Sequence, residues 1–266
     1  MILNISGGEL PLLPLVALTA TMSLSTGGGE RSFEKNCPLS VIGLLLFAVC
    51  PDSEIVPAIG KCRKCIALMS PSQKPRLVVG LSGSSGLPYG IRLLEVLRKL
   101  GTHEVHLILT EAAKLNISVE TDWRVKDVES LADVVHNVMN ISASIASGSF
   151  RTEGMIVAPC SMRTLSAIAH SFADNLLVRA ADVTLKERRR LLVMPREAPL
   201  HTGHCKLLYE ASQLGIIIFP PMPAFYGRPR TIDDLLNTTI GRALDLFGID
   251  AGLVKRWTGV ASKPKK

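Results

Sequence analysis

The sequence is poor in the features that mark several protein classes. Aromatic residues make up only 5% of its 266 residues, which argues against the stacked aromatic platforms that bind single-stranded nucleic acid. Its 6 cysteines are too sparse for the disulfide framework of a small secreted domain, so we expect reduced thiols. An apolar run at residues 41–50 ends at Pro51 and is shorter than the ~20 residues that span a membrane. We therefore predict no nucleic-acid partner and no membrane span.

Motifs for metals and for larger nucleotides are incomplete. Cys62 and Cys65 form one CxxC motif without the second pair that a zinc ribbon requires, and His201 and His204 lack a clear third ligand. The glycine-rich segment 82–86 has neither GxGxxG spacing nor the GK[ST] of a P-loop. We expect no metal and no dinucleotide or ATP site, whereas a mononucleotide phosphate stays compatible with this turn.

The composition divides the chain near residue 75. Residues 1–75 are interrupted by many prolines and by a glycine triplet, so we expect a poorly structured N-terminal extension, either a targeting segment or a flexible one. Residues 76–259 read as one folded domain, and residues 260–266 as a basic tail. Hydrophobic residues at 47% and charged residues at 20% are ordinary for a globular core. The net charge of +7 permits an anionic ligand but is also typical of a soluble surface.

Within the predicted domain, short apolar runs alternate with amphipathic stretches. The apolar runs predict strands buried on both faces, and the amphipathic stretches predict helices. The expected strands cover 76–82, 104–109, 154–158, 190–194 and 215–219, and the expected helices 88–100, 161–170, 175–188, 202–214 and 231–247. This alternation indicates an α/β fold, a Rossmann-like (flavodoxin-type) doubly wound parallel sheet.

Unusual residues follow each predicted strand, where such sheets bind their ligands. The turn 82–86 can bind a phosphate through its amides, although any tight turn between a strand and a helix also favours glycine. Thr110 offers a hydroxyl at the end of the next strand. Glu120 is either an acid–base group or part of a solvated loop. Ser161 either caps the next helix or contacts a ligand, and Cys160 reads as a packed thiol rather than a nucleophile.

Basic residues in the second half of the domain could bind an anion. Arg179 and Lys186 are spaced to share one side of a helix. Arg196 and Glu197 lie between prolines after a buried strand, as a phosphate grip with a proton-carrying carboxyl or as a structural ion pair. Tyr226 lies in a proline-rich loop that follows the last strand. Arg242 and Trp257 complete this set.

Several motifs together resemble one family. They are SGSSG, ETDW, PCSMRTLS, RAADVTLKERR, MPREAPLH and PPMPAFYGRP, and they occur in this order between residues 76 and 259. This part of the chain resembles the UbiX flavin prenyltransferases, formerly called phenylacrylic acid decarboxylases. Ser84, where alanine is common, is a small departure from the family pattern.

The resemblance implies a homododecamer with active sites between subunits. It implies that reduced FMN is prenylated by dimethylallyl phosphate at N5 and C6, with release of phosphate. The product, prenylated FMN, would serve a UbiD-type decarboxylase. Relatives with extensions are commonly mitochondrial, so mitochondrial localisation is the expectation and the cytoplasm the alternative.

The resemblance also implies roles for individual residues. It assigns the flavin site to Gly83, Ser84, Ser85, Gly86, Thr110, Ser161, Thr164 and Arg179. It assigns the prenyl-phosphate site to Lys186, Arg196, Glu197, Tyr226 and Arg242. Ser85 and Glu120 would lie near the reacting flavin edge, and Trp257 would form an aromatic wall of the prenyl pocket. With Lys186 and Glu197, these are the implied catalytic residues.

Three other functions stay open on the sequence. An FMN-dependent decarboxylase of the phosphopantothenoylcysteine type would share the fold, but PREAP and the AFY loop argue against it. Direct decarboxylation of aromatic acids is the second. The third is a non-catalytic flavin-binding module. A flavin that gains one C5 unit in mass would separate the prenyltransferase from all of these.

Overall fold

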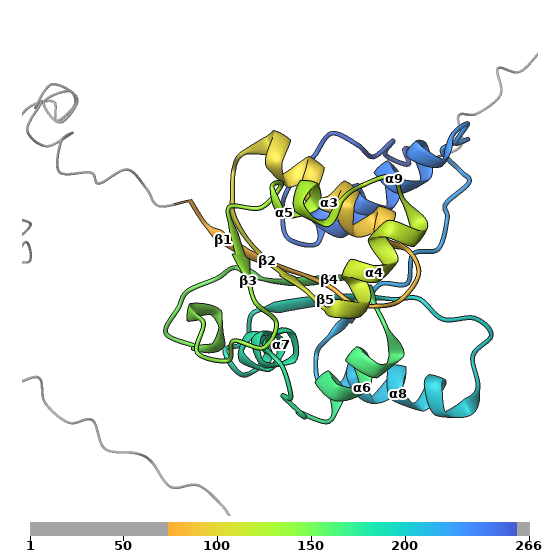
Figure 1. Ribbon diagram of the computed structural model, residues 1–266. Coiled ribbons are helices and arrows are strands. Elements are labelled where there is room, and N and C mark those ends of the chain that lie inside the picture. Colours follow the sequence, from red (N-terminus) through yellow and green to blue (C-terminus); the bar gives the residue numbers. More distant parts are fainter. Residues whose placement is uncertain (1–73, 260–266) are drawn as a thin grey trace, which may run out of the picture. The chain divides into compact units, whose positions relative to one another are not determined.

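A parallel sheet forms the centre of the chain. A computed structural model describes residues 74–259 (Figure 1). Its six-stranded sheet has the order β3-β2-β1-β4-β5-β6, and every neighbouring pair is parallel. The strands are β1 Arg76–Leu81, β2 Glu104–Leu109, β3 Val134–His136, β4 Gly154–Cys160, β5 Arg190–Pro195 and β6 Ile217–Ile218. This is the strand order of a Rossmann-type sheet, so the predicted doubly wound α/β fold is confirmed.

Helices cover both faces of the sheet (Figure 1). One core cluster joins the sheet to α3 Leu87–Leu100, α4 Glu111–Glu120, α5 Val125–Glu129 and α9 Ile232–Asp245. The other joins it to α6 Met162–Ala169, α7 Leu176–Lys186, α8 Thr202–Gln213 and the 3-10 helix η2 Ser144–Ala146.

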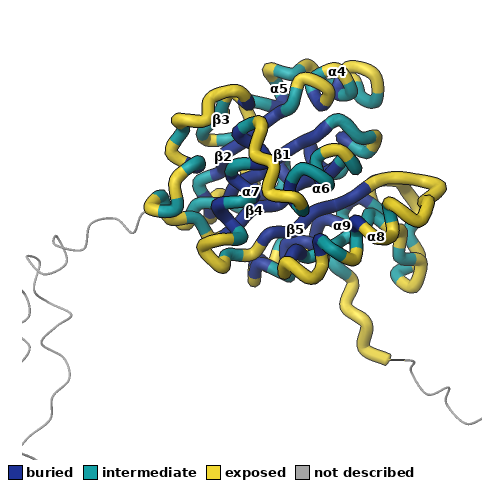
Figure 2. Tube along the Cα trace, turned by 90° about the horizontal axis from the view of Figure 1, so that it is seen from below, coloured by how far each residue is buried: buried dark blue, intermediate teal, exposed yellow. Residues whose placement is uncertain are grey.

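Strand β1 shows how the two layers are built. Leu77, Val79 and Leu81 belong to the first cluster, whereas Val78 belongs to the second, because successive side chains of a strand point to opposite faces. Figure 2 shows β2, β4 and β5 in the buried centre of the domain. Burial on both faces explains why the strands read as continuous apolar runs in the sequence.

The sequence predicted most of the elements and missed β3, α4 and α5. The capping box of α9 is present, with Thr231 accepting from the Asp234 amide and Asp234 accepting from the Thr231 amide. Strand β3, which has 3 residues, escaped prediction because its length carries no periodic signal. Helix α4 escaped because Leu115 and Val119 are exposed and blur its apolar face.

The ends of the chain lie outside the described residues. The predicted extension falls there apart from residues 74 and 75, as do the CxxC motif and the basic tail, so those expectations stay predictions. Within residues 74–259, no helix combines the length and the apolar character that crossing a membrane requires.

Candidate functional site

The carboxyl ends of β1 and β4 meet where the strand order reverses, the position at which doubly wound sheets bind ligands. Buried Ser82 joins these two ends. Its hydroxyl donates to the Pro159 carbonyl at 3.2 Å and accepts from the Ser161 amide at 2.8 Å. The turn after β1 is thereby tied to the segment after β4, so two of the predicted flavin segments lie side by side.

A cavity of about 460 Å³ lies at this edge, and α4, α6 and α7 all begin at it. Each start is capped by a side chain, with Thr110 accepting from the Ala113 amide at 3.1 Å, Ser161 from the Thr164 amide at 3.2 Å and Asn175 from the Val178 amide at 3.1 Å. The lining residues are Gly83, Thr110, Glu111, Ala112, Val138, Met139, Ser161, Arg163, Thr164, Ala167, Asp174, Asn175 and Val178. Helix starts favour negative charge, so the cavity suits a phosphate.

Four predicted flavin residues, Gly83, Thr110, Ser161 and Thr164, therefore line one cavity. Asn175 was missed, although an asparagine directly before the apolar run of α7 is a recognisable N-cap signal. The 138–139 segment was missed because nothing in its local sequence marks it as a wall of the cavity.

The turn 82–86 contains one close approach within the protein and one hydroxyl without a partner. A Cβ on Gly83 would lie 2.3 Å from the Ala112 Cβ, so only glycine leaves this part of the cavity wall in place. The Ser84 hydroxyl is buried and has no hydrogen-bond partner among the described residues. Buried hydroxyls normally have a partner, and a ligand would supply one. The unpartnered hydroxyl fits a bound flavin mononucleotide.

Glu120 changes the interpretation of this turn. Its Oε2 accepts from the Gly86 amide at 2.8 Å and from the Leu87 amide at 3.0 Å. The start of α3 is thus already occupied by a carboxylate of this chain. These two amides are therefore bound within the chain, whereas the expectation that the turn 82–86 binds a phosphate stays a prediction for its other amides. A role for Glu120 near the flavin edge stays a prediction.

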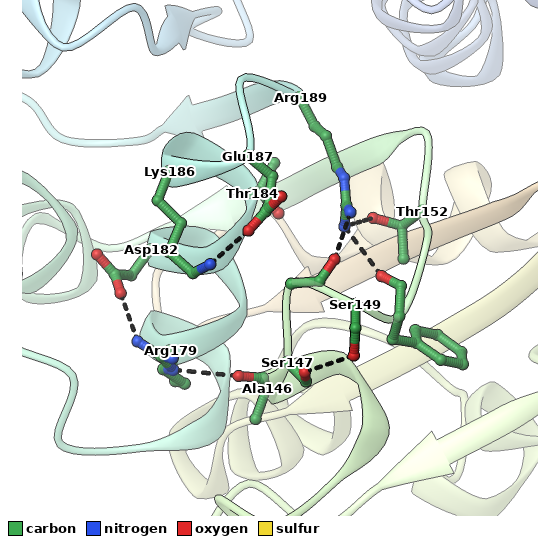
Figure 3. Close-up of polar contacts among 12 residues, drawn as sticks. Ala146, Ser147, Ser149, Thr152, Arg179, Asp182, Thr184, Lys186, Glu187 and Arg189 are labelled. Carbon is green, nitrogen blue, oxygen red and sulfur yellow. Dashed lines mark hydrogen bonds and ion pairs between the residues drawn. The ribbon is translucent and has the colours of Figure 1, made fainter.

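Arg179 and Lys186 do not line the cavity. In Figure 3, Arg179 lies against the 146–149 segment. Its Nε donates to the Ala146 carbonyl at 3.2 Å and its Nη1 to Asp182 at 2.7 Å. Lys186 pairs with Glu187, whose carboxyl pKa this ammonium lowers. Since α7 leads into β5, Lys186 lies at the amino edge of the sheet, away from the cavity. Within one chain, Lys186 is therefore separated from the cavity, whereas Arg179 directly follows the lining residue Val178 in the first turn of α7.

Ser85, Arg196 and Glu197 lie at the carboxyl edge and are exposed. The Arg196 amide donates to the Cys160 carbonyl at 3.3 Å, which holds the start of this loop beside the end of β4. The Glu197 carboxylate accepts from the Ala198 amide at 3.1 Å. None of the three side chains lines the cavity in this single chain.

Tyr226, Arg242 and Trp257 come together in a second cavity of about 580 Å³, which we call the C-terminal chamber. Its remaining lining residues are Val254 and Arg256. The Tyr226 and Trp257 rings meet edge to face, with centroids 5.9 Å apart. The chamber therefore unites predicted residues of the prenyl-phosphate site from three separate parts of the sequence. It adds Arg256, which the sequence analysis missed.

The remaining candidates are not arranged for metal or thiol chemistry. Burial raises the pKa of the Cys160 thiol to about 12, which confirms it as a packed thiol. His201 accepts from the Gly203 amide through Nδ1 at 3.0 Å and so caps α8. In the described part of the chain, no three His, Cys, Asp or Glu residues are grouped to hold a metal ion.

Comparison with known proteins identifies close relatives. A family model described as Flavoprotein matches residues 67–244. The chain is 53% identical over 184 residues to flavin prenyltransferase UbiX of Thauera aromatica, which covers 69% of this chain and 94% of that protein.

Two solved structures are also similar. A dodecameric FMN-dependent UbiX-like decarboxylase from Escherichia coli O157:H7 has a TM-score of 0.68 and 47% identity, covering 69% of this chain and all of that one (100%). AnUbiX, in complex with FMN and dimethylallyl pyrophosphate, has a TM-score of 0.69 and 46% identity, covering 71% of this chain and 100% of the other.

Proposed function

The chain belongs to the UbiX family of flavin prenyltransferases, and on this premise we propose that it transfers a dimethylallyl group from dimethylallyl phosphate to reduced FMN. The product is FMN prenylated at N5 and C6, with phosphate as the second product. The observation that carries the proposal is the meeting of Tyr226, Arg242 and Trp257 in one chamber. They are far apart in the sequence and were each assigned to the prenyl substrate.

The cavity at the carboxyl edge would hold FMN. Thr110, Ser161 and Asn175 fix the starts of α4, α6 and α7, whose positive ends stabilise the flavin phosphate. Gly83 lets the turn pack against Ala112 in the cavity wall, and Ser84 offers a buried hydroxyl. When bound, reduced FMN supplies the nucleophilic ring atoms that accept the prenyl group.

The cationic side chains would stabilise the departing phosphate. Phosphate carries almost two negative charges as it leaves, and guanidinium groups that are already in place lower the energy of that charge. Arg242 lines the chamber and would donate to the oxygens of the departing phosphate. The Tyr226 hydroxyl, which lines the same chamber, can donate to these oxygens too. Trp257 would present an aromatic face to positive charge on the allyl group. Arg196 and Glu197 would act from the neighbouring loop, Glu197 as the proton carrier.

We propose that the chain assembles as a dodecamer, as the similar Escherichia coli protein does. Symmetric assembly gives every copy the same environment, so Lys186 of one copy can complete the site of another. Arg179 of the same helix keeps its expected role as a flavin contact. A shared prenyl site would account for Lys186 lining no cavity of its own chain.

Mixed oligomers test this arrangement. Lys186→Ala and Arg196→Ala are each expected to bind FMN and to lose prenyl transfer. Co-expression of the two variants should restore part of the activity if one site takes Lys186 and Arg196 from different copies. If the mixture stays as inactive as each variant alone, the shared site is refuted. Unchanged turnover in both single variants would refute the two assignments.

The activity itself is tested on the full chain with reduced FMN. We expect dimethylallyl phosphate to increase the flavin mass by one C5 unit. The similar AnUbiX structure holds the pyrophosphate, so a parallel reaction with the pyrophosphate measures which ester is preferred. Release of carbon dioxide from an aromatic acid without flavin prenylation would favour the decarboxylase alternative. FMN binding without either reaction would favour the flavin-binding module.

Two finer proposals follow from the same chemistry. A flavin with an extra ring is useful only to an enzyme that binds it, so we propose that a UbiD-type decarboxylase consumes the product. Addition of the reaction mixture to such an apo-decarboxylase should restore its activity. We keep mitochondrial localisation as a proposal, with the cytoplasm as the alternative, to be tested by fractionation of native cells.

A further inference from the structure

Asp245, the last residue of α9, holds two arginines of the C-terminal chamber at once. Arg242 donates from Nη1 to Oδ2 at 2.9 Å. Arg256 binds the same carboxylate through both Nη atoms, with Nη2 at 2.8 Å from Oδ1. The Asp245 side chain is only 15% exposed. The carboxylate is therefore the common anchor of two guanidinium groups from separate segments.

The charges around Asp245 reinforce this arrangement. Arg256 first, and then Arg242, hold the pKa of the Asp245 carboxyl below its usual range. The same contact raises the pKa of Arg256. Two guanidinium groups meet two carboxylates here, because Asp250 lies 3.5 Å from Arg256 Nη2, but the Asp250 side chain is 79% exposed and its charge is screened by solvent. The two guanidinium groups beside the chamber are the donors that a phosphate ester needs.

Arg256 is placed to contact such an ester directly. It lines the chamber together with Tyr226 and Arg242. Its pairing with Asp245 uses one proton of each Nη, and Nη2 also lies 3.5 Å from Asp250. The Nε proton and other Nη protons can still donate to a ligand. Because the carboxylate fixes the plane of the guanidinium, less side-chain freedom is lost on binding.

We propose that Arg256 is a further phosphate-contacting residue of the prenyl-substrate site, and that Asp245 is a positioning residue which orients both Arg242 and Arg256. The inference rests on the proposed function. Two guanidinium groups of one chain, those of Arg242 and Arg256, then donate to the ester oxygens. Tyr226 lines the same chamber and packs against Trp257.

Binding and kinetics of Arg256→Gln test the first part. With full-length protein loaded with FMN, the KM and Kd for dimethylallyl phosphate should rise about tenfold or more, because one charged hydrogen-bond donor is lost. The affinity for FMN should not change. Arg256→Lys keeps the charge but not the planar guanidinium, so its KM and Kd for dimethylallyl phosphate should lie between those of the wild type and Arg256→Gln. Arg151→Gln, an exposed arginine away from the chamber, is the matched control.

Asp245→Asn tests the positioning role. Asparagine removes the negative charge and replaces one acceptor oxygen by a donor, so Arg256 loses its two-point contact. Both KM and kcat should therefore worsen, whereas Asp245→Glu should recover part of the loss. A purely structural role would instead lower the melting temperature and FMN affinity together, without this separation. That outcome overturns the positioning role.

Inorganic phosphate distinguishes this inference from the proposed function. If the wild type fails to prenylate FMN, the proposed function is refuted, and phosphate titration still decides the role of Arg256. Weaker phosphate binding by Arg256→Gln than by the wild type and Arg151→Gln supports it. Equal binding of phosphate and of the prenyl ester by all three proteins overturns it.

Discussion

Replacement of Gly83 by alanine should disrupt the flavin cavity at a defined point. The added Cβ would lie 2.3 Å from the Ala112 Cβ and 3.3 Å from the backbone of Ala112. Aliphatic carbons approach favourably only to about 3.5–4.0 Å, so roughly 1–2 Å of movement is required. Neither atom belongs to a flexible side chain. The turn after β1 or the first turn of α4 must therefore shift.

The shift has a predictable cost. Overpacking of this kind typically lowers the free energy of unfolding by about 1–3 kcal/mol. Gly83 and Ala112 both line the cavity, so the binding surface moves with them. A shift of the first turn of α4 also moves its helix cap, because Thr110 directly precedes this helix. We expect FMN affinity to fall at least about tenfold, which corresponds to ~1.4 kcal/mol of binding energy.

The assay compares FMN titration and thermal unfolding across matched variants. Gly227→Ala is the control, since a Cβ there meets no described atom within 4 Å. Gly83→Ala combined with Ala112→Gly removes the facing Cβ and should recover part of both losses. The reference for the double variant is Ala112→Gly alone, because glycine in a helix costs about 1 kcal/mol by itself. If Gly83→Ala binds FMN and unfolds like the wild type, the close-approach argument is wrong.

Three further outcomes are expected. Glu120→Gln keeps the shape of the side chain but loses the negative charge that binds the start of α3. The free energy of unfolding, measured by chemical denaturation, should fall by about 1–2 kcal/mol. An unchanged denaturation midpoint would contradict this. Burial lowers the pKa of His106 and His136 below 6.5. The unfolded state therefore binds more protons, and the free energy of unfolding falls as the pH drops below about 6.5. His136→Gln should weaken this pH dependence of stability, and an unchanged dependence would refute the assignment. Iodoacetamide near pH 8 should modify Cys205 but not Cys160, whose buried thiol has a pKa of about 12; peptide mass spectrometry would detect the opposite pattern.

The local chemistry of helix starts made much of the flavin cavity predictable. Thr110 and Ser161 each follow an apolar strand and precede a helix, so strand order alone brings them to one edge of the sheet. The same rule reaches Asn175 once α7 is placed. Local sequence patterns could not predict how closely two separate segments approach each other, as Gly83 and Ala112 do.

Partners far away in the sequence explain what local patterns cannot predict about the site. The residues around Glu120 favour either an acid–base group or a solvated loop, and its role near the flavin stays a prediction. In the structure its carboxylate accepts from the amide of Gly86, 34 positions away. No local pattern predicts such a pairing, because it depends on how α4 folds back beside the turn. Arg256 was missed for a similar reason, since the segment after α9 has no periodicity that aims a side chain.

The position of Lys186 leads to a prediction about assembly. Helical spacing indicates which residues share a side, but the topology decides which edge of the sheet that side reaches. The end of α7 lies at the amino edge, whereas the flavin cavity opens at the carboxyl edge and is lined by residues of one chain. FMN binding should therefore survive dissociation of the oligomer, and prenyl transfer should not. A dilution series tests this, with sedimentation to report the oligomeric state, FMN titration to report binding and product mass to report prenyl transfer. Dilution should abolish prenyl transfer while FMN binding persists. Full turnover by a dissociated chain would refute the requirement for a second copy.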